Sequence, residues 1–426
     1  MAMVAETQST AGGVAPGAFG ARIMALADRL AQWSESPDGL TCTYLSPAHR
    51  AVAGDIRELF RQAGLSPEID DVGNVVGRYP AADPHARALI VASHYDTVRN
   101  AGKYDGRLGV LIALVLVEHL VRTGRKLPFH LDVVAFSEEE GVRFASSFIG
   151  SSAMAGCFDP ALLERRDADG HALAAVMRAA GFDPARIPAL ARRGEELAGY
   201  LEVHIEQGPI LLEEGLPVGI VSAIAGSVRK LVTITGTAGH AGTVPMARRH
   251  DAAAAAAELV LYVERRCAQA PTLVGTVGQL AVPGGAINII PGRCELSLDI
   301  RAADDATRDA AVADVMAEIA RIAARRGVAI ESREVQRTAA VGCSPRLQAL
   351  LADAVTRAGV RPRYLASGAG HDAMVFDGVT DLAMLFVRCG NGGVSHSPRE
   401  IITPEDAEVA ARVVLDAVLQ LAAHPP

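Results

Sequence analysis

One stretch, residues 88–109, constrains the fold more than any other part of the chain. It begins with a continuous apolar run, which is typical of a strand buried on both faces of a parallel sheet. The run, residues 89–92, stops before Ser93 and His94. Asp96 and Asp105 follow in a glycine-containing loop before an apolar helix predicted over 108–120. Three side chains that can bind metal therefore follow the end of a buried strand. Open α/β sheets bind their ligands at this edge.

Apolar runs and segments of helical period alternate along much of the chain. This alternation predicts an α/β fold with a central, mostly parallel sheet and flanking helices. Buried strands are predicted at 89–92, 129–136, 200–205 and 382–387, and helices at 21–33, 48–63, 108–120, 344–358 and 404–421. A hairpin is predicted over 66–79, a short strand at 363–367, and a further helix opening at 368–372.

The pattern changes after Gly215, where alternating, half-exposed strands replace continuous apolar runs. The order strand, helix, strand, strand, helix, strand predicts a small two-layer α+β domain of ferredoxin-like type, inserted into the larger one. Its elements are predicted at 228–235, 250–267, 273–282, 293–301, 304–326 and 328–335. A chain of 426 residues also exceeds one compact core. We therefore predict a catalytic domain formed by residues 1–214 and 332–426, with an inserted domain over 215–331.

The composition restricts the classes of function. A formal net charge of −8, with no basic block, argues against a nucleic-acid or anionic-membrane partner. The six cysteines form no CxxC pair, which favours reduced thiols over a redox motif or a zinc ribbon. Residues 1–18 lack the features of a signal peptide and are predicted to be a disordered tail, and no apolar run approaches the ~18 residues of a membrane span. We expect a soluble, cytoplasmic protein.

Several positions combine metal-binding side chains with a predicted place at the carboxyl end of a strand. They are His94, Asp105, Glu139 or Glu140, His204 and His396. Singly, each is more often a hydrogen-bonded structural or solvated residue, but a set along one sheet edge favours a metal site. Imidazole and carboxylate ligands suit zinc, manganese, cobalt or nickel, and Asp96 would hold the other ring nitrogen of His94. Adjacent glutamates point in different directions, so one can bind metal while its neighbour accepts a proton from the attacking water.

Seven motifs, in order, resemble the hydantoinase/carbamoylase branch of the dinuclear metallo-aminoacylase and carboxypeptidase clan. They are HYDTV with KYDG, EEEGVRF, HIEQG, GHAGTVPM, GAINIIPG with DIRA, SGAGHDA and GVSHSP. The resemblance extends from about residue 20 to 422. This branch contains allantoate amidohydrolases, N-carbamoyl-L-amino-acid hydrolases, β-ureidopropionases and ureidoglycolate hydrolases.

The resemblance implies a metallo-exopeptidase-like catalytic domain that holds two divalent metal ions per subunit. It assigns one metal to His94, Asp105 and His204, and a second to Asp105, Glu140 and His396, with Asp105 as the bridge. Glu139 is implied as the general base. The peptidase branches resemble one another in having a carboxylate at the position of His204, so the histidine favours the ureido-cleaving branch.

The resemblance also implies a substrate site shared between domains and subunits. Its substrate-contacting positions are Gln207, His240, Asn288, Arg301, Gly370 and His371. His240 would reach the site of a second subunit and act there as an oxyanion donor. This role implies a homodimer formed through the inserted domain. The inserted domain would also act as a lid. The fork of Arg301 suits bidentate binding of a substrate carboxylate. Alternatively, Arg301 is an ordinary exposed arginine on a strand, and His240 is a loop histidine that caps local backbone.

We therefore expect a metal-dependent amidohydrolase that cleaves the terminal ureido C–N bond of a small carboxylate and releases ammonia and carbon dioxide. Whole-chain likeness slightly favours allantoate over an N-carbamoyl-L-amino acid as the substrate. The sequence does not decide between them, nor does it identify the metal. One alternative is an aminoacylase or dipeptidase on the same scaffold, which would release no ammonia. Another is a catalytically silent ligand-binding or assembly protein, against which Glu139 and the full ligand set argue.

Overall fold

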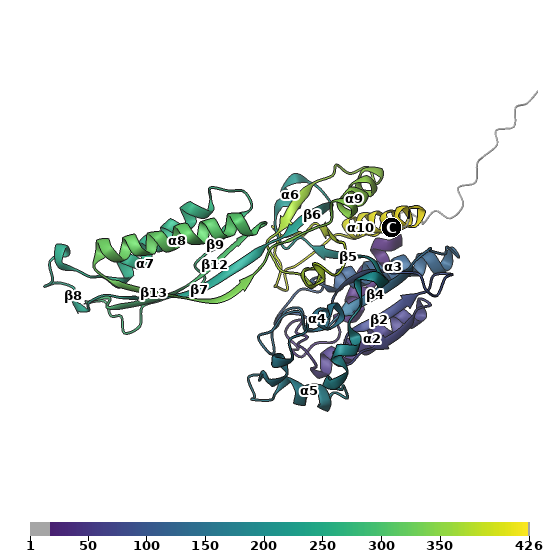
Figure 1. Cartoon of the computed structure of the whole chain (residues 1–426), viewed down its shortest axis with the longest axis horizontal. Coiled ribbons are helices and arrows are strands. Elements are labelled where there is room, and N and C mark those ends of the chain that lie inside the picture. The colour runs from purple at the N-terminus through teal and green to yellow at the C-terminus, as the bar shows by residue number, and fades with distance from the viewer. Residues whose placement is uncertain (1–17, 425–426) are drawn as a thin grey trace, which may run out of the picture. The chain divides into compact units, whose positions relative to one another are not determined.

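The computed structural model describes residues 18–424 and divides them into two compact units (Figure 1). The first unit runs to Val221 and also contains Cys343–Tyr364 and the chain from His371. The second contains Ser222–Gly342 and Leu365–Gly370. The chain thus passes from one unit to the other at 221/222 and 342/343. The predicted domain boundaries are 214/215 and 331/332. Residues 1–17 of the predicted tail lie outside the described residues, and Ala18 begins the first helix.

The first unit contains most of a nine-stranded sheet, whose strands lie in the order β1-β2-β4-β3-β5-β16-β6-β14. The ninth strand, β15 Tyr364–Ser367, pairs with β6 and matches the short strand predicted at 363–367, and β14 is Val341–Gly342. The bounds of the others are β1 Ser66–Ile69, β2 Val75–Tyr79, β3 Ala88–His94, β4 His130–Phe136, β5 Leu197–Ile205, β6 Val218–Ile224 and β16 Leu382–Val387. The four strands β4, β3, β5 and β16 at the centre pair in parallel, and the pairs at both margins are antiparallel. The predicted central, mostly parallel sheet is confirmed.

Helices supply the rest of the hydrophobic core of this unit. The longer ones are α1 Ala18–Leu30, α2 Pro47–Gln62, α3 Arg107–Arg122, α9 Pro345–Arg357 and α10 Pro404–Ala423. The α3 helix is apolar on almost every side, and nearly all of its residues are buried against β3 and neighbouring helices. Because α3 is packed so tightly, its first turn is a rigid platform for the loop that precedes it.

In this unit, one predicted helix is wrong, and one strand was not predicted. The segment at 368–372 does not open an α-helix. It leads into a five-residue 3₁₀ helix, Asp372–Phe376, because the chain turns at Gly378 with φ +73°. The strand β6 was not predicted. The first unit also contains three short helices, α4 Ile149–Ala155, α5 Leu173–Ala179 and α6 Ile210–Glu214.

The second unit is an antiparallel sheet with two helices packed on one face. Its elements are β7 Gly226–Thr235, α7 Ala252–Cys267, β9 Leu273–Thr276, β10 Leu280–Ala281, β12 Arg293–Ala302, α8 Asp305–Arg326 and β13 Ala329–Thr338. Strand β12 alternates as predicted, with Cys294, Leu296, Leu298 and Ile300 buried. The prediction of a single strand over 273–282 is wrong. The segment splits into β9 and β10, because the Ser297 side chain accepts the Gln279 N–H and interrupts the ladder with β12.

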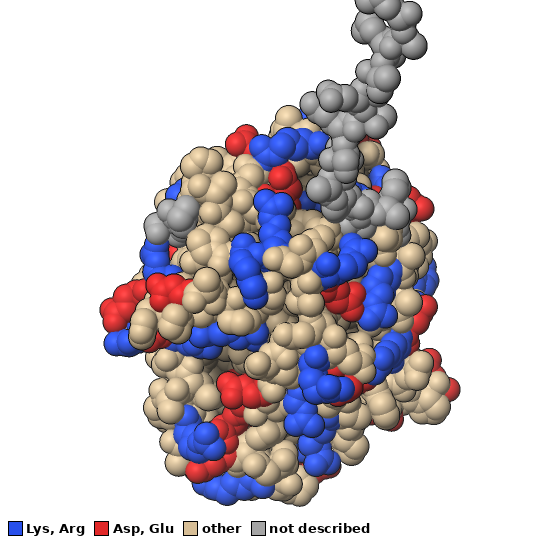
Figure 2. Space-filling view, turned by 90° about the vertical axis from the view of Figure 1, so that its right-hand side faces the viewer, with Lys and Arg blue, Asp and Glu red and all other residues tan. Residues whose placement is uncertain are grey.

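The described part of the chain offers no helix with the length and apolarity needed to cross a membrane. Figure 2 shows a face of the molecule on which lysine and arginine side chains are interspersed with aspartate and glutamate. Charges of both signs therefore lie side by side on that face.

Candidate metal centre

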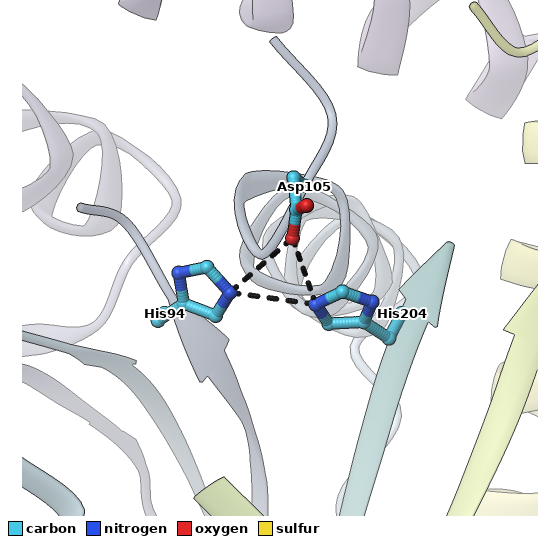
Figure 3. A group of neighbouring side chains, drawn as sticks. All are labelled: His94, Asp105 and His204. Atoms are coloured by element: carbon cyan, nitrogen blue, oxygen red, sulfur yellow. Dashed lines mark hydrogen bonds and ion pairs between the residues drawn. The ribbon is translucent and has the colours of Figure 1, made fainter. Parts of the chain in front are cut away.

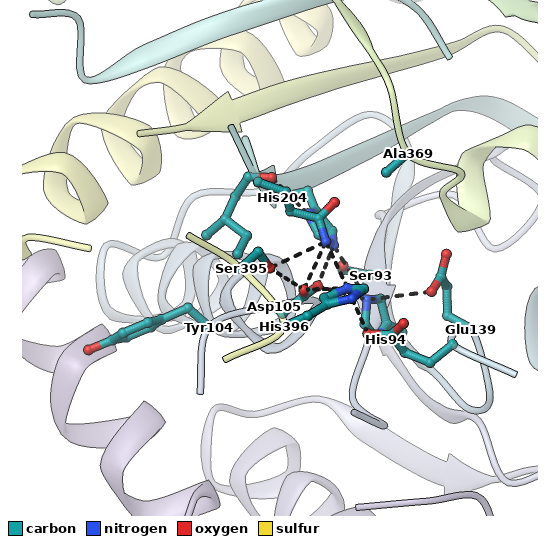
Figure 4. A network of polar contacts seen from close by, with 12 residues as sticks. Ser93, His94, Tyr104, Asp105, Glu139, His204, Ala369, Ser395 and His396 are labelled. Atoms are coloured by element: carbon teal, nitrogen blue, oxygen red, sulfur yellow. Dashed lines mark hydrogen bonds and ion pairs between the residues drawn. The ribbon is translucent and has the colours of Figure 1, made fainter. Parts of the chain in front are cut away.

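Six side chains from five segments converge at the carboxyl edge of the central sheet. Figure 3 shows His94, Asp105 and His204, and Figure 4 shows these three with Glu139 and His396. His94 is the last residue of β3, His204 is the penultimate residue of β5, and Asp105 precedes α3. Glu139 and Glu140 follow β4, and His396 lies in the loop after β16. We call these six residues the metal-ligand cluster. The parallel order of the strands brings them together, because the carboxyl ends of parallel strands share one edge.

One oxygen of Asp105 faces two histidines (Figure 3). Asp105 Oδ1 lies 3.1 Å from His204 Nε2 and 3.5 Å from His94 Nε2. The two Nε2 atoms are 3.4 Å apart, and all three side chains are almost fully buried. Three ligand atoms therefore point toward a common position.

The other oxygen of Asp105 faces a second set of ligands. Asp105 Oδ2 lies 3.3 Å from His396 Nε2, which in turn is 3.5 Å from Glu140 Oε1. The two oxygens of one carboxylate thus serve two different groups. This arrangement fits a carboxylate that bridges two metal ions. His94 with Glu139 and Glu140 forms a further close set.

The hydrogen bonds in the cluster leave room for cations. Among the described residues, the buried atoms Asp105 Oδ1 and Glu140 Oε1 make no hydrogen bond, although histidine nitrogens lie 3.1 and 3.5 Å from them. A buried carboxylate oxygen without a donor carries a free-energy cost that a bound cation removes. Three imidazoles and three carboxylates are also a donor set that divalent transition metals prefer. The residues therefore fit the two metals that the motifs imply.

Contacts outside the cluster fix how the ligands point. His94 Nδ1 lies 3.2 Å from the backbone oxygen of Asp96 and 3.5 Å from its carboxylate, and His204 Nδ1 lies 2.9 Å from the oxygen of Ile205. The Asp96 carboxylate also accepts the backbone N–H groups of Glu139 and Glu140, both at 3.1 Å. Asp96 therefore ties the end of β3 to the glutamates after β4. The sequence did not predict this second contact, because no local pattern reports backbone contacts between distant segments.

Backbone geometry sharpens the turns that carry these side chains. Gly106 has φ +66°, and a Cβ atom there would overlap the His94 ring. Glu138, Gln207 and His396 adopt φ values of 56°, 55° and 53°, which are unusual for residues other than glycine. Such strain concentrates at functional sites, where surrounding contacts maintain it.

The electrostatics of the cluster follow from burial and crowding. Burial raises the pKa of the Glu139 carboxyl well above its usual range, and nearby Glu140 adds to the effect while His94 opposes it. Burial and the Asp105 charge raise the pKa of Glu140 to about 7. The hydrogen bond to Asp105 raises the pKa of His396 to about 9. For Asp105, burial opposes ionisation, but its histidine partners outweigh burial and hold its pKa well below the usual range.

Two of the predicted substrate-contacting residues adjoin the cluster. Gln207 Nε2 donates to Asp105 Oδ2 at 2.8 Å and lies 3.2 Å from His396 Nε2. The buried His371 ring packs edge-on against His204, with centroids 4.5 Å apart. Burial lowers the pKa of His371 well below its usual value, and the neighbouring His204 adds to this effect.

The other predicted substrate residues, His240, Asn288, Arg301 and Gly370, belong to the second unit. His240 is exposed, and Asn288 lies beside it, since the Ala241 N–H donates to the Asn288 oxygen at 2.9 Å. Arg301 lies on the sheet face opposite the helices, where Nε and Nη2 donate to Asp299 at 3.0 and 2.8 Å. The roles of all these residues stay predictions.

Comparison with known proteins identifies the family. The profile of Peptidase family M20/M25/M40 matches residues 90–420. The chain is 41% identical over 384 residues to an N-carbamoyl-L-amino acid amidohydrolase of Geobacillus stearothermophilus, covering 90% of this chain and 94% of that protein. It is 37% identical over 417 residues to allantoate deiminase 1 of Glycine max, covering 91% and 86%.

A solved structure agrees with these relatives. An amidase of the hydantoinase/carbamoylase family from Burkholderia multivorans superposes with a TM-score of 0.90 at 33% identity, covering 96% of this chain and 98% of that one. The resemblance predicted from the seven motifs is confirmed. This chain belongs to the M20/M25/M40 peptidase family and is a hydrolase of C–N bonds.

Proposed function

We propose that this protein is a dinuclear metal-dependent amidohydrolase that cleaves the terminal ureido group of a small carboxylate, with release of ammonia and carbon dioxide. The observation that carries the proposal is the divided carboxylate of Asp105, whose two oxygens face two separate ligand groups. The names of the relatives add the reaction class, since those cited are an N-carbamoyl-amino-acid amidohydrolase and an allantoate deiminase.

The proposed metal sites use the predicted ligands. His94, Asp105 and His204 would hold one ion, and Asp105, Glu140 and His396 the other. Bound there, divalent metals supply Lewis acidity that polarises the scissile carbonyl and lowers the pKa of the attacking water.

Glu139 is the proposed general base. Its backbone N–H is held by Asp96, and its Oε2 lies 4.0 Å from His94 Nε2, at the border of the cluster. A raised pKa suits its task, because Glu139 must keep the proton that it takes from water long enough to deliver it to the leaving nitrogen.

Arg301 is the proposed receptor for the substrate carboxylate. Asp299 occupies its Nε/Nη2 edge, and one Nη1 hydrogen goes to the Gly368 oxygen at 2.8 Å. One hydrogen on Nη1 and one on Nη2 remain for a ligand. Asp299 also accepts from Arg229 Nε at 3.1 Å, so the arginine is held in place before substrate arrives. Binding a carboxylate with an already oriented guanidinium saves the entropy of ordering it.

We further propose that His240 acts on the active site of a second subunit and donates to the developing oxyanion. The surface around it supports an intermolecular contact. Ile287 is fully exposed, and Met246 is 77% exposed. Exposed apolar side chains beside a polar functional residue are typical of an interaction site. We propose that this surface is covered by the same domain of a second copy of this chain in a homodimer.

Allantoate and N-carbamoyl-L-amino acids are the two proposed substrates, since both carry a carboxylate and a terminal ureido group. Allantoate is tested first. The experiment measures ammonia released by the manganese-loaded protein from allantoate, a set of N-carbamoyl-L-amino acids, N-acetyl amino acids and dipeptides. Ammonia from either ureido class, one per bond cleaved, supports the proposal and identifies the substrate. Cleavage of the acetyl compounds or dipeptides alone, without ammonia, would establish the aminoacylase or dipeptidase alternative. A protein inert on all of these compounds would establish the alternative of a catalytically silent binding or assembly protein.

A further inference from the structure

We propose that Ser395 and Glu400 are positioning residues that hold Asp105 and His396 in register for the second of the two metals. This inference rests on the proposed dinuclear centre. Neither residue carries a predicted role, and both lie in the loop that follows β16. We call their contacts with the loop before α3 the brace.

Glu400 forms one half of the brace by binding backbone. Glu400 is only 3% exposed, and its Oε1 accepts the N–H groups of Tyr104 and Asp105 at 2.9 and 3.1 Å. A buried carboxylate with two backbone donors is a strong, charge-assisted contact. Glu400 thereby fixes the backbone from which the Asp105 carboxylate projects.

Ser395 forms the other half by binding the carboxylate itself (Figure 4). Its Oγ lies 2.7 Å from Asp105 Oδ2 and 3.1 Å from Glu400 Oε2. A serine hydroxyl has one hydrogen, so it donates to one carboxylate at a time. Because Ser395 directly precedes His396, the same contact that orients Asp105 Oδ2 also anchors the backbone of His396.

Close packing keeps the two loops together. A Cβ atom at Gly102 would overlap the Glu400 side chain, so only glycine lets the loop before α3 pass this close. The loop after β16 is also closed on itself, since Asn391 Nδ2 donates to the Arg399 oxygen at 2.6 Å and the Glu400 N–H donates to the Ser397 oxygen at 3.0 Å. Asp105 and His396 therefore project from two loops that are packed against each other.

The brace acts on one ligand group more than on the other. Its direct contact with the ligand carboxylate is to Oδ2, the oxygen that faces His396. The partners of Oδ1, His94 and His204, project instead from the ends of strands β3 and β5, which the sheet holds independently. Loss of the Ser395 hydroxyl should therefore weaken the second metal and spare the first. A merely structural role would weaken both equally.

The test titrates metal-free protein with Mn²⁺ and measures the number of ions bound and the dissociation constant of each by calorimetry. We expect wild-type protein to bind two ions and Ser395→Ala to bind one of them about 10- to 100-fold more weakly, the usual cost of losing a partner of a metal ligand. Ser395→Thr, which keeps the hydroxyl, should restore the affinity. Ser397→Ala is the matched control, because Ser397 lies in the same loop and, within residues 18–424, its hydroxyl accepts only from the Arg399 N–H at the surface.

The outcomes separate this inference from the function on which it rests. Two ions in the wild type with unchanged or equally weakened sites in Ser395→Ala would overturn the brace and leave the dinuclear centre standing. Fewer than two ions in the wild type would overturn both.

Discussion

Replacing Glu139 by glutamine separates catalysis from metal binding. The change keeps the size of the side chain and removes the negative charge that accepts a proton. Its backbone stays anchored, since Asp96 Oδ1 accepts the residue 139 N–H at 3.1 Å whichever side chain is present. A positioned general base contributes about 10²- to 10⁴-fold to the rate, which corresponds to about 3–5 kcal/mol of activation free energy. We expect kcat to fall by this factor with KM and metal content unchanged.

The assay measures ammonia release with the better of the two ureido substrates, together with metal content and thermal unfolding of each variant. Burial raises the pKa of Glu139, so its charge is costly in the folded state and Glu139→Gln should unfold at the same or a higher temperature than wild type. Glu140→Gln is the matched control. The same change one residue along the chain should instead lower metal affinity, because Glu140 belongs to the second ligand group. A Glu139→Gln enzyme that binds both metals and keeps more than about a tenth of the wild-type kcat would refute the assignment of the base, which predicts at least about a 10²-fold loss.

Four further predictions follow from the site. Metal binding must displace the proton of His396, whose pKa is raised to about 9, and the proton of Glu140, whose pKa is raised to about 7. The affinity for Mn²⁺ should therefore rise between pH 6 and 8 by about tenfold per pH unit for each proton released, and an affinity that calorimetry finds independent of pH would contradict this. Arg301→Lys should raise KM by about 10-fold or more with little change in kcat, because a lysine cannot reproduce the oriented fork; an unchanged KM would remove Arg301 from substrate binding. Gly106→Ala should destabilise the fold by about 1–3 kcal/mol and weaken metal binding, since the new Cβ meets the His94 ring at a positive φ; chemical denaturation would detect the loss, and wild-type stability would show that the loop yields freely. His240→Ala and Glu139→Gln, each inactive alone, should recover activity when mixed in one dimer; the lack of any recovery in co-expressed heterodimers would place His240 outside the partner's site.

Much of the scaffold follows from local sequence patterns. The strands β3, β4, β5 and β16 are mainly apolar, and α2 begins at Ser46, whose side chain accepts the His49 N–H with Pro47 in the first turn. A strand that is buried on both faces is apolar along most of its length, so it can be recognised from its own residues. The strand β6 escaped notice because it lies where the alternating pattern begins, and it pairs antiparallel to β16 at a margin of the central sheet.

The site divides in the same way. Ligand residue types at strand ends indicate a metal centre, and the structure brings His94, Asp105, Glu140, His204 and His396 together. The contacts that orient them join segments far apart in sequence. Asp96 binds the backbone of residues 139 and 140, and Glu400 binds that of residues 104 and 105. A carboxylate that accepts backbone N–H groups leaves no residue pattern at the distant end of the contact, so only the folded chain reveals it.

The central claim is that ureido cleavage depends on two metal ions held by this cluster. The most direct test adds Mn²⁺ stepwise to metal-free protein and measures ammonia release from allantoate and from N-carbamoyl-L-amino acids in the same samples. We expect no ammonia without metal, rising release as ions are added, and a plateau at two ions per chain. Full activity in the metal-free protein, a plateau at one ion, or no ammonia from any ureido substrate at saturating metal would contradict it.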